Sequence, residues 1–177
     1  EEKEMGTALV DIGGGTTDIA IWKNGSLIHS QIIPVGGSHF TNDLAVALKV
    51  SNKEAERVKT KHGSVLAETL NQSAHISVQG LAGTKPREVQ LSVVAEVLGA
   101  RGEELFSIVN SILGEKNLKN EINGGVVLTG GGSLIKGLPE LGEYTLGVPT
   151  KVSAPIPIGG MTKVIESPIY STVLGLL

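Results

Sequence analysis

Two runs of three consecutive glycines restrict what this 177-residue chain can fold into. Each run follows an apolar segment typical of a β-strand: Gly13-Gly14-Gly15 follows Thr7–Ile12, and Gly130-Gly131-Gly132 follows Gly125–Thr129. Glycine lets a backbone approach a ligand closely, because it has no side chain. The chain holds 24 glycines, which is close to twice the usual share of about 7 %. We therefore expect each of these strands to end in a loop that exposes its backbone, without side chains, to a ligand.

Composition excludes several function classes. The chain has no cysteine, which rules out disulfides, a thiol nucleophile and a cysteine-bound metal, and fits a reducing cytoplasm. A formal net charge of −3 offers no general attraction for nucleic acid. No apolar run approaches the ~18 residues of a membrane helix. The start, Glu1-Glu2-Lys3-Glu4, resembles neither a signal peptide nor a natural beginning, so we expect a piece of a longer protein.

The order of elements predicts one sheet with an inserted lobe. Residues 7–35 are typical of three antiparallel strands, with Asn24-Gly25 as a hairpin turn. The last third alternates strand and helix. We expect residues 1–50 and 122–177 to form an α/β subdomain with a mixed sheet. Residues 51–121 would form a smaller inserted α+β subdomain.

The inserted lobe has its own local signals. Ser51 followed by Glu54 is a capping-box pattern that begins a helix. Two strands are expected within residues 74–91, followed by a helix over about 92–117. Gly99 and Gly102 are candidates for a kink or break in that long helix.

The segment from Asp11 to Asp18 predicts a phosphate-binding hairpin. It joins two strands, which argues against a dinucleotide-binding loop, and it lacks the lysine of a Walker A loop. Backbone N–H groups of Gly13, Gly14 and Gly15 and the hydroxyls of Thr16 and Thr17 are candidate donors to phosphate. Asp11 and Asp18 suit Mg²⁺, which one or two carboxylates and waters commonly hold. The alternative is a tight hairpin with a capping aspartate.

The second glycine run, with Ser133, lies between a strand and a helical stretch. Such a loop can place a phosphate or ribose against backbone and a helix N-terminus. Close packing of helix on strand explains the glycines of Gly130-Gly131-Gly132-Ser133 equally well.

Together, the two segments resemble motifs of the actin-like ATPase superfamily, whose subdomains have a ribonuclease H-like fold. The octet Asp11–Asp18 matches its second phosphate motif, and Val127–Ser133 matches its adenosine motif. Between them, Ala55–Lys59 resembles the helix from which a glutamate and a lysine reach ribose and adenine, which corresponds to Glu56 and Lys59 here. These two share a helix face, so a solvated ion pair is the alternative.

Within the superfamily, the chain resembles the FtsA family of bacterial cell-division proteins. Three stretches carry this resemblance: Lys61-His62-Gly63, Gly125–Leu138 and Ser167–Leu177. They imply only the second lobe of such a protein, without the first lobe and without the C-terminal amphipathic helix through which the family reaches the membrane.

The resemblance implies ATP and Mg²⁺ as ligands, with half of a two-lobed site present. It implies at most a weak ATPase in the full-length protein, and an inactive lobe alone. The expected location is the cytoplasmic face of the inner membrane at the division site. Expected partners are further copies of the protein and the C-terminal peptide of FtsZ, with Arg101 and Glu104 on the docking helix Val97–Asn110 as contacts.

Two other readings share these motifs. One is a phosphotransferase lobe of the sugar-kinase kind, which needs a catalytic carboxylate from the other lobe. The other is a pilus-assembly or rod-shape relative with a different partner. The Lys61-His62-Gly63 stretch and the C-terminal ending favour the cell-division reading.

Overall fold

A computed structural model describes residues 2–71, 73–81, 84–155 and 167–176. Five strands form one mixed sheet in the order β3-β2-β1-β6-β7, and two more form a separate hairpin. The strands are β1 (Thr7–Ile12), β2 (Thr17–Lys23), β3 (Ser26–Ile33), β4 (His75–Val78), β5 (Arg87–Gln90), β6 (Val126–Thr129) and β7 (Thr150–Val152). The α-helices are α1 (Glu2–Met5), α2 (Gly37–Ala47), α3 (Asn52–His62), α4 (Leu91–Glu115), α5 (Leu138–Leu146) and α6 (Ser171–Gly175). Short 3-10 helices are η1 (Ala67–Thr69), η2 (Leu118–Glu121), η3 (Gly131–Leu134) and η5 (Pro168–Tyr170).

The large sheet combines two pairing modes. The strands β1, β2 and β3 form the predicted antiparallel meander, and Asn24 and Gly25 both have positive φ at its turn. The strands β1 and β6 are parallel, with Asp11 opposite Thr129, and β6 and β7 are parallel as well. Because β1 and β6 are parallel neighbours, the glycine run after each strand emerges at the same edge of the sheet.

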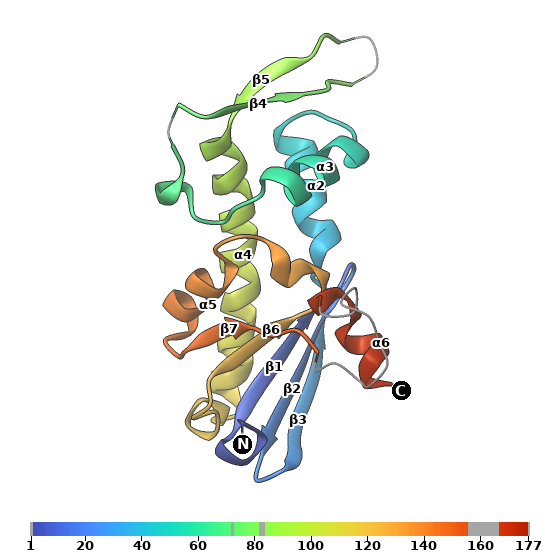
Figure 1. Ribbon diagram of the computed structural model, residues 1–177. Coiled ribbons are helices and arrows are strands. Elements are labelled where there is room, and N and C mark those ends of the chain that lie inside the picture. Colours follow the sequence, from blue (N-terminus) through green and yellow to red (C-terminus); the bar gives the residue numbers. More distant parts are fainter. Residues whose placement is uncertain (1, 72, 82–83, 156–166, 177) are drawn as a thin grey trace.

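The long helix α4 is continuous through Gly99 and Gly102, so the predicted break at these glycines was wrong. Figure 1 shows α4 running from the β4–β5 hairpin down to the side of the sheet. A Cβ at Gly99 would lie 2.9 Å from the Val65 carbonyl oxygen, and one at Gly102 would lie 2.8 Å from Leu141 Cδ2. These glycines therefore allow close packing of other segments against the helix.

A single cluster of buried apolar side chains connects the sheet with the helices. Ile12, Ile19 and Ile21 from the sheet belong to it, together with Phe40 from α2 and Phe106 from α4. Buried side chains of α4 belong to the same cluster as those of the β4–β5 hairpin and of the large sheet. Apolar packing is therefore continuous between the two predicted subdomains. Among the described helices, none is both long and apolar enough to cross a membrane.

Of the two hydrogen bonds of a capping box, the start of α3 forms the one from the Glu54 backbone to the Ser51 side chain. The Ser51 hydroxyl oxygen accepts a hydrogen bond from the Glu54 backbone N–H at 3.2 Å, as expected. The Glu54 carboxylate instead binds Arg57 and the backbone N–H of Gln79. The helix start is therefore joined to the segment that follows β4.

Candidate functional site

The two glycine runs line one cavity at the carboxyl ends of β1 and β6. Its volume is about 580 Å³. The lining comes from five parts of the chain: the hairpin after β1, the start of α2, one face of α3 with the residue that ends it, the segment that follows β6, and the segment that precedes α6. The lining residues are Gly13, Gly14, Gly37, Ser38, Glu56, Lys59, Thr60, Gly63, Gly131, Gly132, Leu134, Ile135, Lys136 and Ile169.

The hairpin after β1 is held against the start of α2. The Gly13 N–H donates to the Thr16 carbonyl oxygen at 2.9 Å, which closes the turn. The N–H groups of Gly37 and Ser38 donate to the carbonyl oxygens of Gly13 and Gly14 at 2.8 and 2.7 Å. Within the described residues, the N–H groups of Gly14, Gly15 and Thr16 have no acceptor. They are exposed donors of the kind that binds phosphate oxygens.

The two threonines of this hairpin have different environments. Thr17 is fully buried, and its hydroxyl donates to the Val35 carbonyl oxygen at 2.7 Å. That hydroxyl serves the fold, so the donor role predicted for it is not available in this arrangement. Thr16 is exposed, with its hydroxyl 3.5 Å from Asp18 Oδ2, and is not among the cavity-lining residues.

The second glycine run packs against β1 as well as lining the cavity. Gly130 has φ of +80°, and a Cβ there would lie 2.3 Å from Asp11 Oδ1. A Cβ at Gly132 would lie 2.3 Å from Ile12 Cγ2. Ser133 is buried and its hydroxyl donates to the Gly130 carbonyl oxygen at 2.7 Å, so it closes a turn and does not face the cavity. The close-packing explanation therefore holds for part of this run, while Gly131 and Gly132 also face the open space.

Asp11 and Asp18 lie opposite each other across β1 and β2. Asp11 is half-buried and Asp18 is exposed. In the described part of the chain, no group of three or more His, Cys, Asp or Glu side chains could hold a metal ion. Neither carboxylate is among the cavity-lining residues. Two carboxylates beside a glycine-rich hairpin are chemically suited to Mg²⁺, which keeps most of its waters and takes few protein ligands.

Glu56 and Lys59 both line the cavity, and they bind each other at 2.8 Å. Lys59 Nζ also donates to the Gly37 carbonyl oxygen and to Thr41 Oγ1, each at 2.8 Å. Burial raises the pKa of Glu56, but hydrogen bonds from Lys59 and Thr41 outweigh this and hold that pKa below its usual value. Lys59 is thus a link between α3 and α2, and more than a solvated ion-pair partner.

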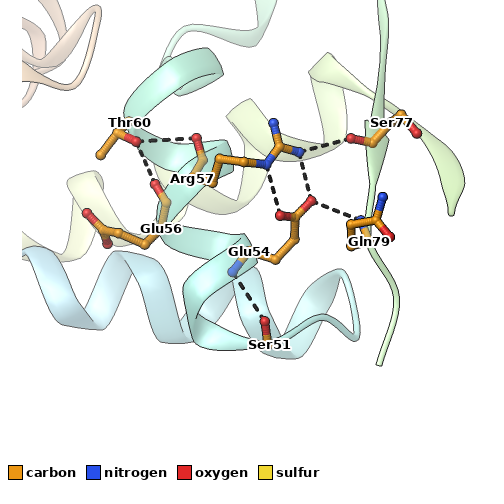
Figure 2. A network of polar contacts seen from close by, with 7 residues as sticks. All are labelled: Ser51, Glu54, Glu56, Arg57, Thr60, Ser77 and Gln79. Atoms are coloured by element: carbon orange, nitrogen blue, oxygen red, sulfur yellow. Dashed lines mark hydrogen bonds and ion pairs between the residues drawn. The ribbon is translucent and has the colours of Figure 1, made fainter. Parts of the chain in front are cut away.

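A polar network on the other side of α3 joins the helix to the hairpin (Figure 2). Arg57 donates to both carboxylate oxygens of Glu54 at 2.9 and 2.7 Å, and to the Ser77 carbonyl oxygen at 3.0 Å. The Gln79 N–H donates to Glu54 at 2.9 Å. The Arg57 hydrogen bonds lower the pKa of Glu54 to about 2, against the opposing effect of burial. This network fixes the orientation of α3, and with it the position of Glu56 and Lys59.

The predicted partner residues Arg101 and Glu104 lie together on α4. Arg101 binds Asp43 of α2 through two bonds of 2.6 and 3.0 Å, and it also binds Glu104. The hydrogen bonds to Asp43 raise the pKa of the Arg101 guanidinium, which stays charged. Both residues line a depression of about 300 Å³ with Asp43, Val97 and Ala100. An incoming carboxylate would therefore compete with Asp43 for Arg101.

Two residues that support the cavity wall were not among the predicted site residues. Gly36 approaches the hairpin so closely that a Cβ there would lie 2.8 Å from Gly13 O, Gly15 C and Thr16 N. Thr41 is a buried hydroxyl between Glu56 and Lys59. The glycine pair Gly36-Gly37, which ends a strand as the two triplets do, was the available signal for this part of the site.

The mixed five-stranded sheet, with glycine loops after two parallel strands and a second lobe above them, defines an actin-like ATPase fold. Two solved structures support this assignment. MreB5 of Spiroplasma citri bound to ADP has a TM-score of 0.76 and 23 % identity, over 99 % of this chain and 54 % of that one. A PilM–PilN type IV pilus biogenesis complex has a TM-score of 0.72 and 20 % identity, over 99 % and 46 %.

The family follows from sequence. The protein-family model described as "Cell division protein FtsA" matches residues 8–175 of this chain. Cell division protein FtsA of Pseudomonas aeruginosa is 41 % identical over 177 residues, which are 100 % of this chain and 42 % of that protein. The Escherichia coli K12 protein of the same name is 35 % identical over 184 residues, which cover 100 % and 44 %. The chain belongs to the FtsA family and spans less than half the length of these relatives.

Proposed function

We propose that this chain is the ATP-binding lobe of a cell-division adaptor of the FtsA family. One observation carries the proposal: the two glycine loops, the start of α2 and the Glu56–Lys59 face of α3 converge on one cavity of about 580 Å³. This volume lies within the common range of about 300–1,000 Å³ for small-molecule sites. A fold neighbour, MreB5, is described as bound to ADP.

Residues that line the cavity, and others next to them in the chain that do not line it, suit the parts of a nucleotide. The exposed N–H groups of Gly14, Gly15 and Thr16 would bind phosphate oxygens. Asp11 and Asp18 would hold a hydrated Mg²⁺, which neutralises phosphate charge. Glu56 and Lys59 would contact the ribose and base from α3, on the far side of the cavity. In the whole protein, the first lobe would cover the opposite side of the nucleotide, so we expect at most weak ATP hydrolysis there and none by this lobe alone.

The same lobe is proposed to dock the C-terminal peptide of FtsZ and to support actin-like self-assembly at the division site. The depression between α2 and α4 offers apolar surface from Val97 and Ala100 beside the charged groups of Arg101, Asp43 and Glu104. A disordered tail has to order on docking, so its affinity would be modest. Membrane association would depend on the remainder of the full-length protein.

Nucleotide binding can be tested by calorimetric titration of the 177-residue chain with ATP and Mg²⁺. We expect saturable binding that the substitution Asp11→Ala weakens by roughly tenfold or more, since it removes a carboxylate proposed to hold Mg²⁺. The matched control is Lys53→Ala, an exposed change on α3 outside the cavity. Absence of ATP binding by the unmodified chain would contradict the proposed function.

Partner docking can be tested separately, by titrating a fluorescently labelled FtsZ tail peptide without nucleotide. We expect weak, saturable binding that Arg101→Glu removes, because a carboxylate there repels the acidic groups of a peptide. A control is Glu143→Gln, an exposed position on α5. No binding by the unmodified chain at about 1 mM, a free energy of about −4 kcal/mol, would count against the adaptor role.

A further inference from the structure

Helix α6 binds the ends of two strands that lie far from it in sequence. The Thr172 hydroxyl donates a hydrogen bond to Asp11 Oδ2 at 2.5 Å. The hydroxyl oxygens of Ser171 and Thr129 are 2.5 Å apart. Asp11 and Thr129 are themselves opposite each other in the parallel pair β1–β6. Two consecutive residues of α6 therefore contact two paired residues at the point where both glycine loops begin.

The segment just before α6 adds contacts at the same place. The Gly130 N–H donates to the Pro168 carbonyl oxygen at 3.2 Å. Ile169 lines the cavity beside Gly131, where an added Cβ would lie 3.8 Å from Ile169 Cγ1. Ile169 thus lies at the cavity, and Pro168, Ser171 and Thr172 on either side of it bind residues at or just after the ends of β1 and β6.

The Thr172 hydrogen bond determines how the Asp11 carboxylate is oriented. A carboxylate has two oxygens with about four acceptor positions, and Thr172 occupies one position on Oδ2. The other oxygen, Oδ1, lies against the Gly130 backbone, where only a glycine fits. With both oxygens fixed in this way, the remaining acceptor positions have a defined direction before any cation arrives. Outer contacts of this kind change metal affinity by about 10–100-fold in other proteins.

We propose that Thr172 is a positioning residue for Asp11, which makes α6 a structural part of the metal–nucleotide site. This inference rests on the proposed ATP binding. Its consequence is specific: loss of the Thr172 hydroxyl reduces the gain in ATP affinity that Mg²⁺ provides, while ATP binding without metal stays the same. A residue that only stabilised the fold would affect both kinds of binding alike.

The test compares Thr172→Val, which keeps the shape but lacks the hydroxyl, with Thr172→Ser, which keeps the hydroxyl. Binding of a fluorescent ATP analogue to the 177-residue chain is measured in EDTA and over a Mg²⁺ titration. We expect Thr172→Val to raise the Mg²⁺ midpoint by roughly tenfold and Thr172→Ser to restore it. The matched control is Thr145→Val on α5, whose hydroxyl donates to the Leu141 carbonyl oxygen within its own helix.

Each of the other possible results contradicts either the positioning role of Thr172 or the proposed ATP binding. If the unmodified chain gains affinity with Mg²⁺ and Thr172→Val gains as much, Thr172 does not position Asp11. If Thr172→Val loses binding equally in EDTA, or Thr172→Ser fails to restore the midpoint, its role is only structural. If ATP binds without any Mg²⁺ effect, the positioning role fails while the ATP-binding lobe stands. If ATP does not bind at all, the proposed function itself fails.

Discussion

Lys59 Nζ lies 2.8 Å from the hydroxyl oxygen of Thr41, and this contact joins the two parts of the cavity wall. Lys59 belongs to α3, whereas Thr41 belongs to α2. The first residues of α2 donate hydrogen bonds to the glycine hairpin that follows β1. The ammonium group also reaches the Gly37 carbonyl oxygen at 2.8 Å. The Lys59 side chain therefore connects α3 to the part of α2 that binds the hairpin.

Lys59→Met should lower both stability and nucleotide affinity. It removes three charge-assisted contacts from a side chain that is only 10 % exposed, and leaves Glu56 without its cation. We expect a loss of about 2 kcal/mol in the free energy of unfolding, measured in urea. ATP affinity should fall roughly tenfold, which corresponds to about 1.4 kcal/mol. The exposed Lys53→Met on the same helix is the control, and an equal effect there would refute the assignment.

Glu54 should make the free energy of unfolding depend on pH in the acidic range. Its pKa is about 2 in the folded chain and 4.5 as the ordinary value, so the ionised form stabilises the fold. That contribution, up to about 3 kcal/mol, is fully present above pH 4.5 and is lost as the pH falls from 4.5 toward 2. Glu54→Gln should flatten the pH profile of unfolding between these values, whereas the exposed Glu143→Gln should not. Parallel profiles for all three proteins would show that the Arg57 contact contributes nothing.

Gly36→Ala should disturb the hairpin without a large effect elsewhere. The added Cβ would lie 2.8 Å from three backbone atoms of residues 13–16, so the loop has to shift. We expect ATP affinity to fall tenfold or more, with a stability cost of about 1–3 kcal/mol. Gly114→Ala is the control: in the described part of the chain, no atom outside its chain neighbours and the adjacent backbone of its own helix lies within 4 Å of the new Cβ, so α4 should gain up to about 1 kcal/mol. Unchanged ATP affinity in Gly36→Ala would separate the hairpin from nucleotide binding.

Local sequence patterns predicted most of the secondary structure. Alternating apolar residues and the Asn24-Gly25 turn were enough for the meander, because strand period and turn chemistry are local properties. The same local reasoning failed at Gly99 and Gly102, since a glycine lowers helix propensity whether or not something packs against it. Only the folded chain shows Val65 and Leu141 occupying that space.

The candidate site was predictable where local sequence motifs indicated it. It was not predictable where side chains that are distant in the sequence meet in the fold. Glu56 and Lys59 were assigned through the resemblance of Ala55–Lys59 to a helix of the superfamily, and their spacing on α3 places both on one face. The contacts Thr172–Asp11 and Arg101–Asp43 join residues 161 and 58 positions apart and leave no pattern in the sequence. The direction of the Thr17 hydroxyl, toward Val35, was equally hidden.

Asp43→Asn tests whether Arg101 is a peptide contact, since Asp43 now occupies its guanidinium. Losing this partly exposed pair should cost about 1 kcal/mol of stability. The released guanidinium should then bind a peptide carboxylate without first displacing Asp43, so affinity for the FtsZ tail should rise about threefold by fluorescence anisotropy. Glu103→Gln removes the same charge from an exposed position on α4 and controls for a general electrostatic effect. A weaker or unchanged affinity in Asp43→Asn would mean that Arg101 binds α2 and not the peptide. The predicted docking surface would then have to depend on the apolar groups of Val97 and Ala100.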